Sequence, residues 1–337
     1  VLLSIAATAV LLAGCGKDKD KDVDASLLSS DATILQFVSA DTPYVLANVE
    51  PLPDDLMDKL EPKIERLLQS YQSMLRAVID TKRQELPEEE RDSEKHERAD
   101  AVINELMTLM SIEGMRDAGI GRDATGVLYG NGLLPVARVD LTEGDLFDDA
   151  LARLETEAGE KLPVVEIGGH TVRYYEADKV KILLGVIDNQ AVFTVAPVSF
   201  DDAQLAVLLG VEPPKNSVAD TGMLQKIAED YGFTNHYVGY IDVQAIAERF
   251  VGEAKGLDAE LIALMAADAP ELSDVCRAEI RSVAGIAPRM VLGYTDVDVD
   301  QLDTVMVIEL RDDIASGMQT LSSTVPGLGG DKGGLMS

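Results

Sequence analysis

The spacing of apolar residues predicts a long amphipathic helix near the start of the chain. Over residues 54–81, apolar side chains recur at steps of three and four positions, which places them on one face of a helix. The same spacing returns over 101–111. The mostly charged residues 82–100 between these two segments, with Pro87 among them, predict an exposed turn. The apolar positions of the long helix are Leu56, Leu60, Ile64, Leu67, Tyr71, Met74, Leu75 and Val78.

From residue 126 the pattern changes to short runs of β-favouring residues separated by turn residues. Gly130-Asn131-Gly132, Gly168-Gly169 and Asp188-Asn189 predict hairpin turns. The runs on either side of the last two turns predict an antiparallel meander, with a helix before it at 145–158 and another after it at 200–209. The predicted strands are Val127–Tyr129, Leu133–Leu141, Val164–Ile167, His170–Ala177, Lys179–Ile187 and Ala191–Val195.

The order of predicted elements occurs twice along the chain. Each part opens with a short helix and a strand (32–39 and 44–49 in the first part), continues with helices, and then has a hairpin and another helix. We therefore predict an α+β protein with antiparallel sheets covered by amphipathic helices, built from two diverged copies of one module at 31–214 and 215–337. The alternative is that such orders recur by chance in α+β proteins. The elements of the second part are 223–231, 236–242, 243–286, 290–294, 304–310 and 312–322.

The second module contains no counterpart of the meander at 164–195. Its last residues, GLGGDKGGLMS, are rich in glycine. The comparison of the two modules predicts that the natural chain continues beyond Ser337 and that the second module is incomplete at its C-terminus.

The N-terminal residues predict secretion and lipid attachment. Residues 1–14 are apolar and uncharged, and the run is shorter than the about 20 residues of a membrane-spanning helix, which is typical of a signal peptide. Leu12-Ala13-Gly14-Cys15 resembles the lipobox of bacterial lipoproteins, in which a peptidase cuts before a cysteine that receives lipid. The resemblance implies that Cys15 is the lipid attachment site and that its acyl chains hold the protein to a membrane. Residues 15–30 predict a flexible charged tether.

A second resemblance lies shortly after the tether. The segment that opens with Asp41-Thr42-Pro43-Tyr44 and ends at Pro53 is similar to the opening of an uncharacterised family of Gram-negative bacterial lipoproteins. The resemblance implies a location in the cell envelope and no known activity, so it transfers no catalytic residue. Gly16, in place of aspartate after Cys15, favours the outer membrane by analogy with enteric lipoprotein sorting.

The charge of the chain narrows the classes of partner. Its 337 residues carry a formal net charge of −31, which repels nucleic acid phosphates and anionic lipid headgroups. Nucleic-acid binding is therefore not expected. Tryptophan is absent and aromatic residues make up 4% of the chain. This composition weakens the case for a carbohydrate-binding site, because such sites commonly stack sugar rings on aromatic side chains.

Sequence motifs for catalysis and for cofactor binding are missing. The three histidines, His96, His170 and His236, are far apart and form no HExxH motif, and no Gly-x-Ser-x-Gly nucleophile elbow occurs. We therefore name no catalytic, cofactor-binding or metal-binding residue, and we expect no cofactor. Cys15, as the site of lipid attachment, is the one functional residue that the sequence predicts.

Two further features leave alternatives open. The four aspartates of residues 296–303 supply the carboxylate oxygens that calcium prefers, but the turn glycine and terminal glutamate of an EF-hand loop are absent, and a solvated hairpin turn also explains the run. Cys276 is an odd thiol beside Cys15. It is a buried apolar residue on a helix, one half of a disulfide with a partner beyond Ser337, or a catalytic thiol. The aspartates are Asp296, Asp298, Asp300 and Asp303.

These observations predict a membrane-anchored envelope lipoprotein that acts as a non-enzymatic scaffold or partner-binding protein. Its expected partners are the membrane, through the lipid on Cys15, and another protein of the envelope. One alternative is a carrier of a lipid or other apolar ligand, with the methionines as an adaptable lining. A second alternative is a hydrolase that uses carboxylates, because the many acidic residues allow a facing pair.

Overall fold

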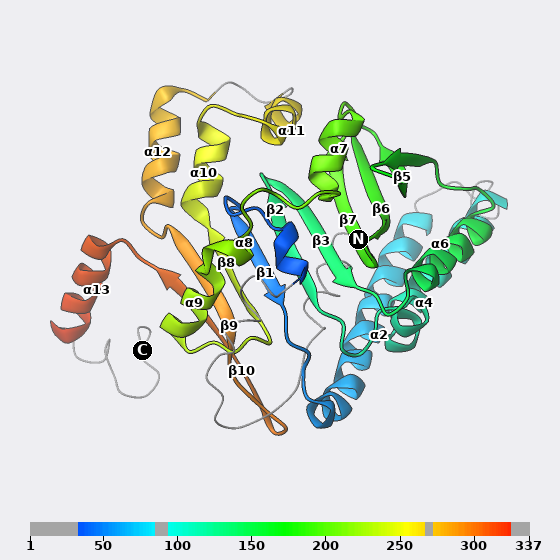
Figure 1. The fold of residues 1–337 in the computed structure, drawn as a ribbon, viewed down its shortest axis with the longest axis horizontal. Coiled ribbons are helices and arrows are strands. Elements are labelled where there is room, and N and C mark those ends of the chain that lie inside the picture. The colour runs from blue at the N-terminus through cyan, green and yellow to red at the C-terminus, as the bar shows by residue number, and fades with distance from the viewer. Residues whose placement is uncertain (1–32, 85–93, 267–271, 325–337) are drawn as a thin grey trace.

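The computed structural model describes residues 33–84, 94–266 and 272–324, and an antiparallel sheet of ten strands forms its centre (Figure 1). The order across the sheet is β10-β9-β8-β1-β2-β3-β7-β6-β5-β4. Helices cover both faces, so the predicted α+β class with an antiparallel sheet is confirmed. The strands are β1 Tyr44–Asn48, β2 Gly126–Asn131, β3 Leu134–Asp140, β4 Val164–Ile167, β5 His170–Ala177, β6 Val180–Ile187, β7 Gln190–Pro197, β8 Val238–Asp242, β9 Arg289–Asp298 and β10 Gln301–Glu309.

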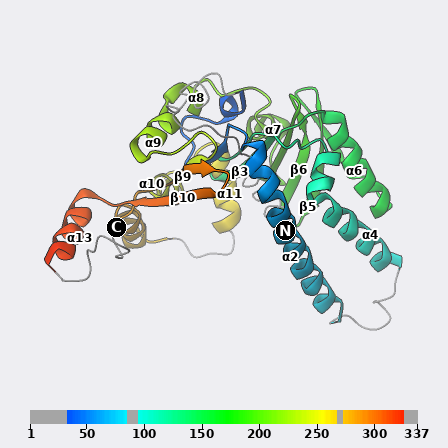
Figure 2. The same cartoon turned by 90° about the horizontal axis from the view of Figure 1, so that it is seen from below.

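Two layers of helices sandwich the sheet. In the edge-on view of Figure 2, α8 and α9 lie on one side of the sheet and α2 and α4 extend from the other. The first layer is η1 Thr33–Phe37, α7 Asp202–Leu209, α8 Val218–Thr221 and α9 Met223–Tyr231. The remaining helices are α2 Asp54–Gln84, α4 Glu94–Leu109, α5 Ile112–Asp117, α6 Gly144–Ala158, α10 Val243–Val251, α11 Leu257–Ala266, α12 Asp274–Ala284 and α13 Asp312–Thr324.

The main hydrophobic core lies between the sheet and the layer that contains η1, α7, α8 and α9. Alternate side chains of the strands point into it, as the two-residue period of a strand requires, and both Val45 on β1 and Val238 on β8 are fully buried there. The helices contribute buried leucines to the same core, namely Leu35 of η1, Leu208 of α7 and Leu224 of α9. On the opposite face the start of α2 packs through Leu56, beside Val297 of β9.

Two similar halves meet at the centre of the sheet, where β1 and β8 run antiparallel with Val45 opposite Tyr240. β2 and β3 follow β1 on one side, and β9 and β10 follow β8 on the other. Each half has the order short helix, strand, helices, hairpin, helix. A duplication would produce this arrangement, and the duplication itself stays a prediction. The two predicted modules share one sheet and one core.

Many predicted elements occur at the predicted residues. The ranges of β4, β5 and α9 coincide with the prediction, and the turn at Asp188-Asn189 has the positive φ angles, 52° and 60°, of a tight hairpin. The hairpin turn between β2 and β3 lies at Gly132-Leu133, because Asn131 still pairs with Leu134. This turn was expected to begin two residues earlier.

The prediction of an exposed turn over residues 82–100 is wrong at both ends. Residues 82–84 belong to α2, and α4 already begins at Glu94. Glutamate, lysine and arginine are good helix formers, so a run of charges is compatible with an exposed helix as well as with a turn. Residues 85–93 lie outside the described residues.

Candidate functional site

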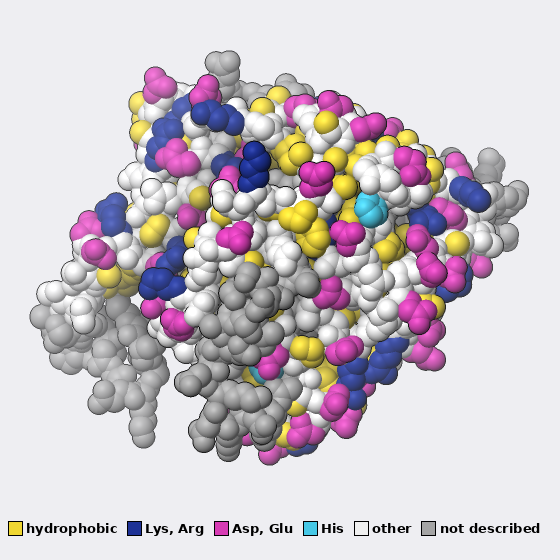
Figure 3. Space-filling view, viewed as in Figure 1, with side chains coloured by type: hydrophobic (Ala, Val, Ile, Leu, Met, Phe, Trp, Pro, Cys, Tyr) yellow, Lys and Arg dark blue, Asp and Glu magenta, His cyan; other side chains and the backbone are white. Residues whose placement is uncertain are grey.

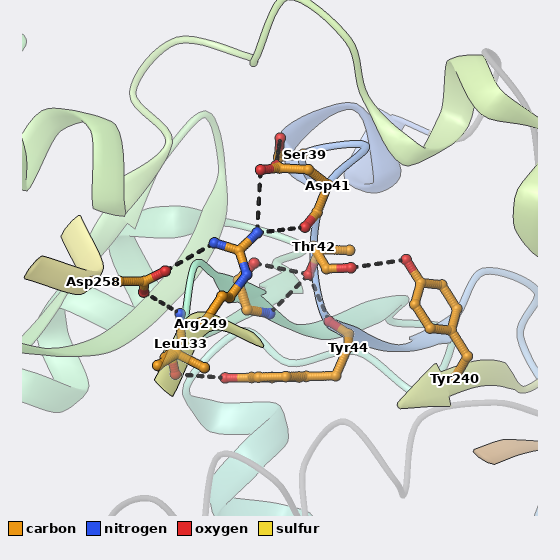
Figure 4. A network of polar contacts seen from close by, with 9 residues as sticks. Ser39, Asp41, Thr42, Tyr44, Leu133, Tyr240, Arg249 and Asp258 are labelled. Atoms are coloured by element: carbon orange, nitrogen blue, oxygen red, sulfur yellow. Dashed lines mark hydrogen bonds and ion pairs between the residues drawn. The ribbon is translucent and has the colours of Figure 1, made fainter. Parts of the chain in front are cut away.

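The segment Asp41–Tyr44, which carries the family resemblance, forms the centre of a polar network at the start of β1 (Figure 4). The network connects β1 to the β2–β3 hairpin of the first half and to β8, α10 and α11 of the second half. We call it the joint. Its members are Ser39, Asp41, Thr42, Tyr44, Gly130, Leu133, Tyr240, Arg249 and Asp258.

Thr42, two residues before β1, connects the β2–β3 hairpin of the first half with β8 of the second half, and it is 4% exposed. Its hydroxyl oxygen lies 2.8 Å from the carbonyl oxygen of Gly130 and accepts the amide proton of Gly130 at 3.2 Å. Its carbonyl oxygen accepts the hydroxyl proton of Tyr240 on β8 at 3.1 Å. The hydroxyl of Tyr44 donates to the carbonyl oxygen of Leu133 at 3.3 Å, and burial raises the pKa of Tyr44, so this hydroxyl stays protonated.

A partly buried ion pair completes the joint. Asp258 on α11 is 3% exposed, and its carboxylate lies 2.8 Å from Nη1 of Arg249 on α10 and accepts the amide proton of Leu133 at 2.6 Å. Nη2 of Arg249 donates to the carbonyl oxygen of Asp41 at 2.7 Å. The hydroxyl of Ser39 and then the guanidinium of Arg249 hold the pKa of Asp41 below its usual value. The carboxylate of Asp41 is therefore ionised at neutral pH, and Asp41 and Asp258 face the same guanidinium.

The backbone around the joint fits only glycine at two positions. Gly132 has a φ of +62°, and a Cβ there would lie 2.2 Å from Oδ1 of Asp258. At Gly130 a Cβ would lie 2.5 Å from the carbonyl oxygen of Gly132 and 2.9 Å from Cε1 of Tyr44. The hairpin turn therefore packs directly against the ion pair. Because the joint's hydrogen bonds run between its own members, we assign it the role of connecting the two halves.

A fully buried cation lies on β3. Arg138 is 0% exposed, and its guanidinium donates to Oε1 of Gln190 at 2.6 Å and to the carbonyl oxygens of Leu209 and Gly210 at 2.6 and 2.7 Å. The two carbonyls belong to the C-terminal end of α7, where the helix dipole is negative. The guanidinium also stacks 3.7 Å from the ring centroid of Phe37. Burial lowers the pKa of Arg138, and the nearby side chain of Tyr129 offsets part of this shift.

The exposed surface of α2 is the candidate interaction site. Four apolar side chains on this helix remain 41–53% exposed, although the helix packs against α4 with its neighbouring face. On that packed face Leu68 is 3% exposed, and the amide of Gln72 donates to the carbonyl oxygen of Met107 at 2.8 Å. We call the exposed set the α2 stripe. It consists of Leu67 (51%), Tyr71 (41%), Met74 (53%) and Val78 (51%).

The electrostatics of α2 differ from those of the whole chain. Its sequence contains six acidic and six basic residues, so its net charge is zero, whereas the whole chain carries −31. Acidic side chains are spread over the face visible in Figure 3. Lys63, one turn before Leu67, is exposed at the end of the stripe. The stripe therefore lies on a helix that is less acidic than its surroundings.

The histidines lie on separate elements. His96 is part of α4, His170 begins β5, and His236 is 6% exposed ahead of β8, with Nδ1 3.2 Å from the carbonyl oxygen of Glu50. Cys276 is half-buried on α12 as a free thiol. Cys15, the predicted lipid attachment site, lies outside the described residues.

The acidic run at 296–303 lies on the β9–β10 hairpin. Asp300 at its tip forms an exposed ion pair with Lys59 of α2, with 2.6 Å between Oδ1 and Nζ. Within residues 33–84, 94–266 and 272–324, no group of three acidic, histidine or cysteine side chains is arranged to hold a metal ion. The sequence predicted neither the joint nor the exposure of the α2 stripe. The partners of the joint are far apart in the chain, and a stripe on a core face has the same spacing as an exposed one.

Comparison with known proteins finds no matching family model, no matching curated protein and no matching solved structure. The resemblance to envelope lipoproteins therefore stays a prediction. None of the helices in the described part of the chain combines the length and the apolar character that a membrane crossing requires.

Proposed function

We propose that this chain is a non-enzymatic scaffold of the bacterial cell envelope, anchored through lipid on Cys15, which binds a helical segment of a partner protein along α2. The observation that carries the proposal is the exposure of the α2 stripe. Folding within the described residues has buried the neighbouring face of the same helix against α4 and has left these four large apolar side chains in solvent. Exposed apolar rows of this kind are a feature of protein interaction sites.

The spacing of the stripe suits an α-helix as its occupant. Leu67, Tyr71, Met74 and Val78 follow one another at steps of four, three and four, which is the spacing of the contact positions in a coiled coil. At about 100° per residue these positions span about 60° of the helix circumference. A helix that lies on a membrane has a wider apolar face, and the charge of −31 opposes binding to anionic lipids. The narrow seam therefore favours a partner helix over a lipid surface.

The neutrality of α2 specifies the charge of that partner helix. An acidic partner would be repelled by most of the surface of this chain but not by α2 itself, and Lys63 offers it a cation beside Leu67. We infer that the partner presents an amphipathic helix with acidic residues beside its apolar seam. A second copy of α2 is a poorer occupant, because α2 has as many basic as acidic residues and so offers no excess of acidic side chains to Lys63.

Site-specific crosslinking tests the proposal. A photo-crosslinking phenylalanine at Tyr71, in cells of the bacterium that produces the protein, is expected to give one discrete adduct with an envelope protein. The matched control is the same substitution at Tyr175, which is 57% exposed on β5 and away from the stripe. Met74→Glu is expected to abolish the adduct, because it places a charge in the seam. Met265→Glu, at a 56% exposed methionine on α11, is expected to leave the adduct intact.

The other outcomes decide against the proposal. Equal adducts from Tyr71 and Tyr175, or an adduct that survives Met74→Glu, would show that the stripe is not the binding surface. A stable adduct of lipid mass in native mass spectrometry, on protein with Cys15→Ala, would favour the carrier alternative instead. Cys15→Ala is itself expected to move the protein from the membrane fraction to the soluble fraction of the envelope, which tests the anchor separately.

A further inference from the structure

The edge strand β10 has few of the features that protect an exposed edge from pairing. It is nine residues long, and its stretch from Thr304 to Ile308 contains no charge, no proline and no glycine. Met306 and Ile308 are 60% and 52% exposed, while Val305 and Val307 pack against the core. An edge with unpaired backbone groups and apolar side chains is a template for another strand.

The opposite edge of the same sheet is protected. β4 has only four residues, Glu166 lies in its middle, and Pro163 directly precedes it. Short length, charge and proline are the usual ways in which proteins prevent edge pairing. The two edges of one sheet therefore differ, and the difference marks β10 as the edge that accepts a partner.

The strand that corresponds to β10 in the first half is paired on both sides. β3 lies third from the centre of the sheet, as β10 does, and its outer side pairs antiparallel with β7, with Val136 opposite Thr194. The equivalent position beside β10 is occupied by no described strand. The architecture of the first half thus indicates which type of element fits there, namely an antiparallel strand.

We propose that β10 pairs with β10 of a second copy of this chain, around a two-fold axis at Val307, and joins two sheets into one. Two-fold symmetry makes two identical edge strands antiparallel without any further adjustment. In this register Met306 faces the partner's Ile308. Asp303 comes beside the partner's Arg311, which lies two residues beyond the end of β10 and pairs with Asp313 in its own chain. Each contact occurs twice, so the pairing has two apolar contacts on the exposed face and two of opposite charge at its ends.

Charge and the length of the strand select this register over its neighbours. A two-fold axis at Met306 would place Asp303 opposite the partner's Glu309 and so pair like charges, which destabilises a sheet. An axis at Ile308 would leave only Val307, Ile308 and Glu309 of β10 opposite the partner strand, because β10 ends at Glu309. The net charge of −31 on each copy also opposes association. The dimer is therefore reversible and concentration-dependent, and it strengthens when salt screens the repulsion.

Sedimentation velocity across a wide range of protein concentrations tests the pairing, on the chain from residue 15 onward with Cys15→Ala. The double variant Met306→Lys/Ile308→Lys places lysines opposite each other across the axis and is expected to weaken the dimer about tenfold or more. The matched variant Met306→Glu/Ile308→Lys changes the same two exposed positions but places opposite charges across the axis. It is expected to retain the dimer.

Disulfide trapping tests the register in the same chain with Cys276→Ser. Val307→Cys is expected to crosslink two copies on oxidation, because residue 307 faces itself across the axis. Val305→Cys faces the partner's Glu309 and is expected to remain uncrosslinked. Crosslinking that is equal at the two positions would overturn the register.

Other results would overturn the pairing as a whole. They are a chain that stays monomeric at every concentration and salt level, or a dimer that persists in Met306→Lys/Ile308→Lys. A dimer that disappears in Met74→Glu would place self-association on the α2 stripe instead. Because the α2 stripe and β10 are altered by different substitutions, failure of this proposal leaves the proposed binding of a partner helix open to its own test.

Discussion

The two halves of the sheet contain corresponding strands, but one half is closed and the other is open. In the first half β3 is covered by α7 and paired with β7, so even an arginine on it is fully buried. In the second half β10 occupies the corresponding place, and side chains such as Met306 are 60% exposed. Strands of similar sequence thus belong to the core or to the surface according to what pairs with their outer edge.

The comparison also indicates that the residues that stabilise the fold differ from the residues proposed to bind partners. The closed half and the joint contain the buried charges, each held by several hydrogen bonds. The exposed apolar residues of α2 and β10 lie outside these networks. Substitutions in the first group are therefore expected to change the free energy of unfolding, and substitutions in the second group are expected to change binding.

The largest expected effect is at Arg138. Arg138→Ala leaves Gln190 and the carbonyl oxygens at the end of α7 without a donor and removes the packing on Phe37. We expect a loss of about 3 kcal/mol in the free energy of unfolding, measured with urea, because buried partners are left unsatisfied. The control is Arg311→Ala, at the end of β10, where the arginine forms an exposed pair with Asp313 and no measurable loss is expected. Similar losses in both variants would contradict the distinction between a closed and an open half.

A smaller effect is expected from one methyl group at the joint. Gly132→Ala combines a positive φ with a contact of 2.2 Å to the carboxylate of Asp258, and we expect it to cost about 2 kcal/mol. Gly169→Ala is the matched control, because its φ is also positive, at +84°, but a Cβ there meets open space. It is expected to cost about 1 kcal/mol. Equal melting temperatures for the two variants would show that the turn does not pack on the ion pair as described.

The sequence predicts the elements of this fold well, because local spacing determines them. The alternation of apolar residues places β5 at its observed bounds, and the same reasoning locates α9. The charged residues 94–100 were predicted to form a turn but belong to a helix, because an exposed helix and an exposed turn have similar compositions. The sequence also predicted several strands without indicating that all of them belong to one sheet. Pairing such as that of β1 with β8 joins residues far apart in the chain.

The candidate sites were less predictable than the elements. The segment Asp41–Tyr44 attracted attention only through a predicted family resemblance, whereas its contacts depend on Arg249 and Asp258, more than 200 residues further along the chain. The periodicity of α2 identified Leu67 and Met74 as apolar positions. Whether such a row is buried or exposed depends on which face α4 covers, and the spacing alone does not determine this.

The smallest expected effect concerns Glu309, which connects β10 with β9 and α9 in the open half. Its carboxylate accepts hydrogen bonds from Arg289 of β9 at 2.7 and 2.8 Å and from the hydroxyl of Tyr231 of α9 at 2.7 Å. Burial raises the pKa of Glu309, but the hydrogen bonds from Arg289 and Tyr231 outweigh this effect, so its pKa in the folded state lies below the ordinary value of 4.5. The ionised carboxylate therefore stabilises the fold above that ordinary value, and this stabilisation is lost as the pH falls through the folded pKa.

Glu309→Gln isolates this contribution, because glutamine has nearly the same shape and cannot ionise. We expect the variant to be slightly less stable than the wild type at neutral pH, since solvent screens a partly exposed pair. The difference between the two proteins is expected to shrink towards zero as urea unfolding is repeated at increasingly acidic pH. A difference that stays constant with pH would assign the effect to shape rather than charge. Because Glu309 is the last residue of β10, a difference that shrinks as expected means that ionisation of this carboxylate helps to hold the open edge strand against the rest of the sheet.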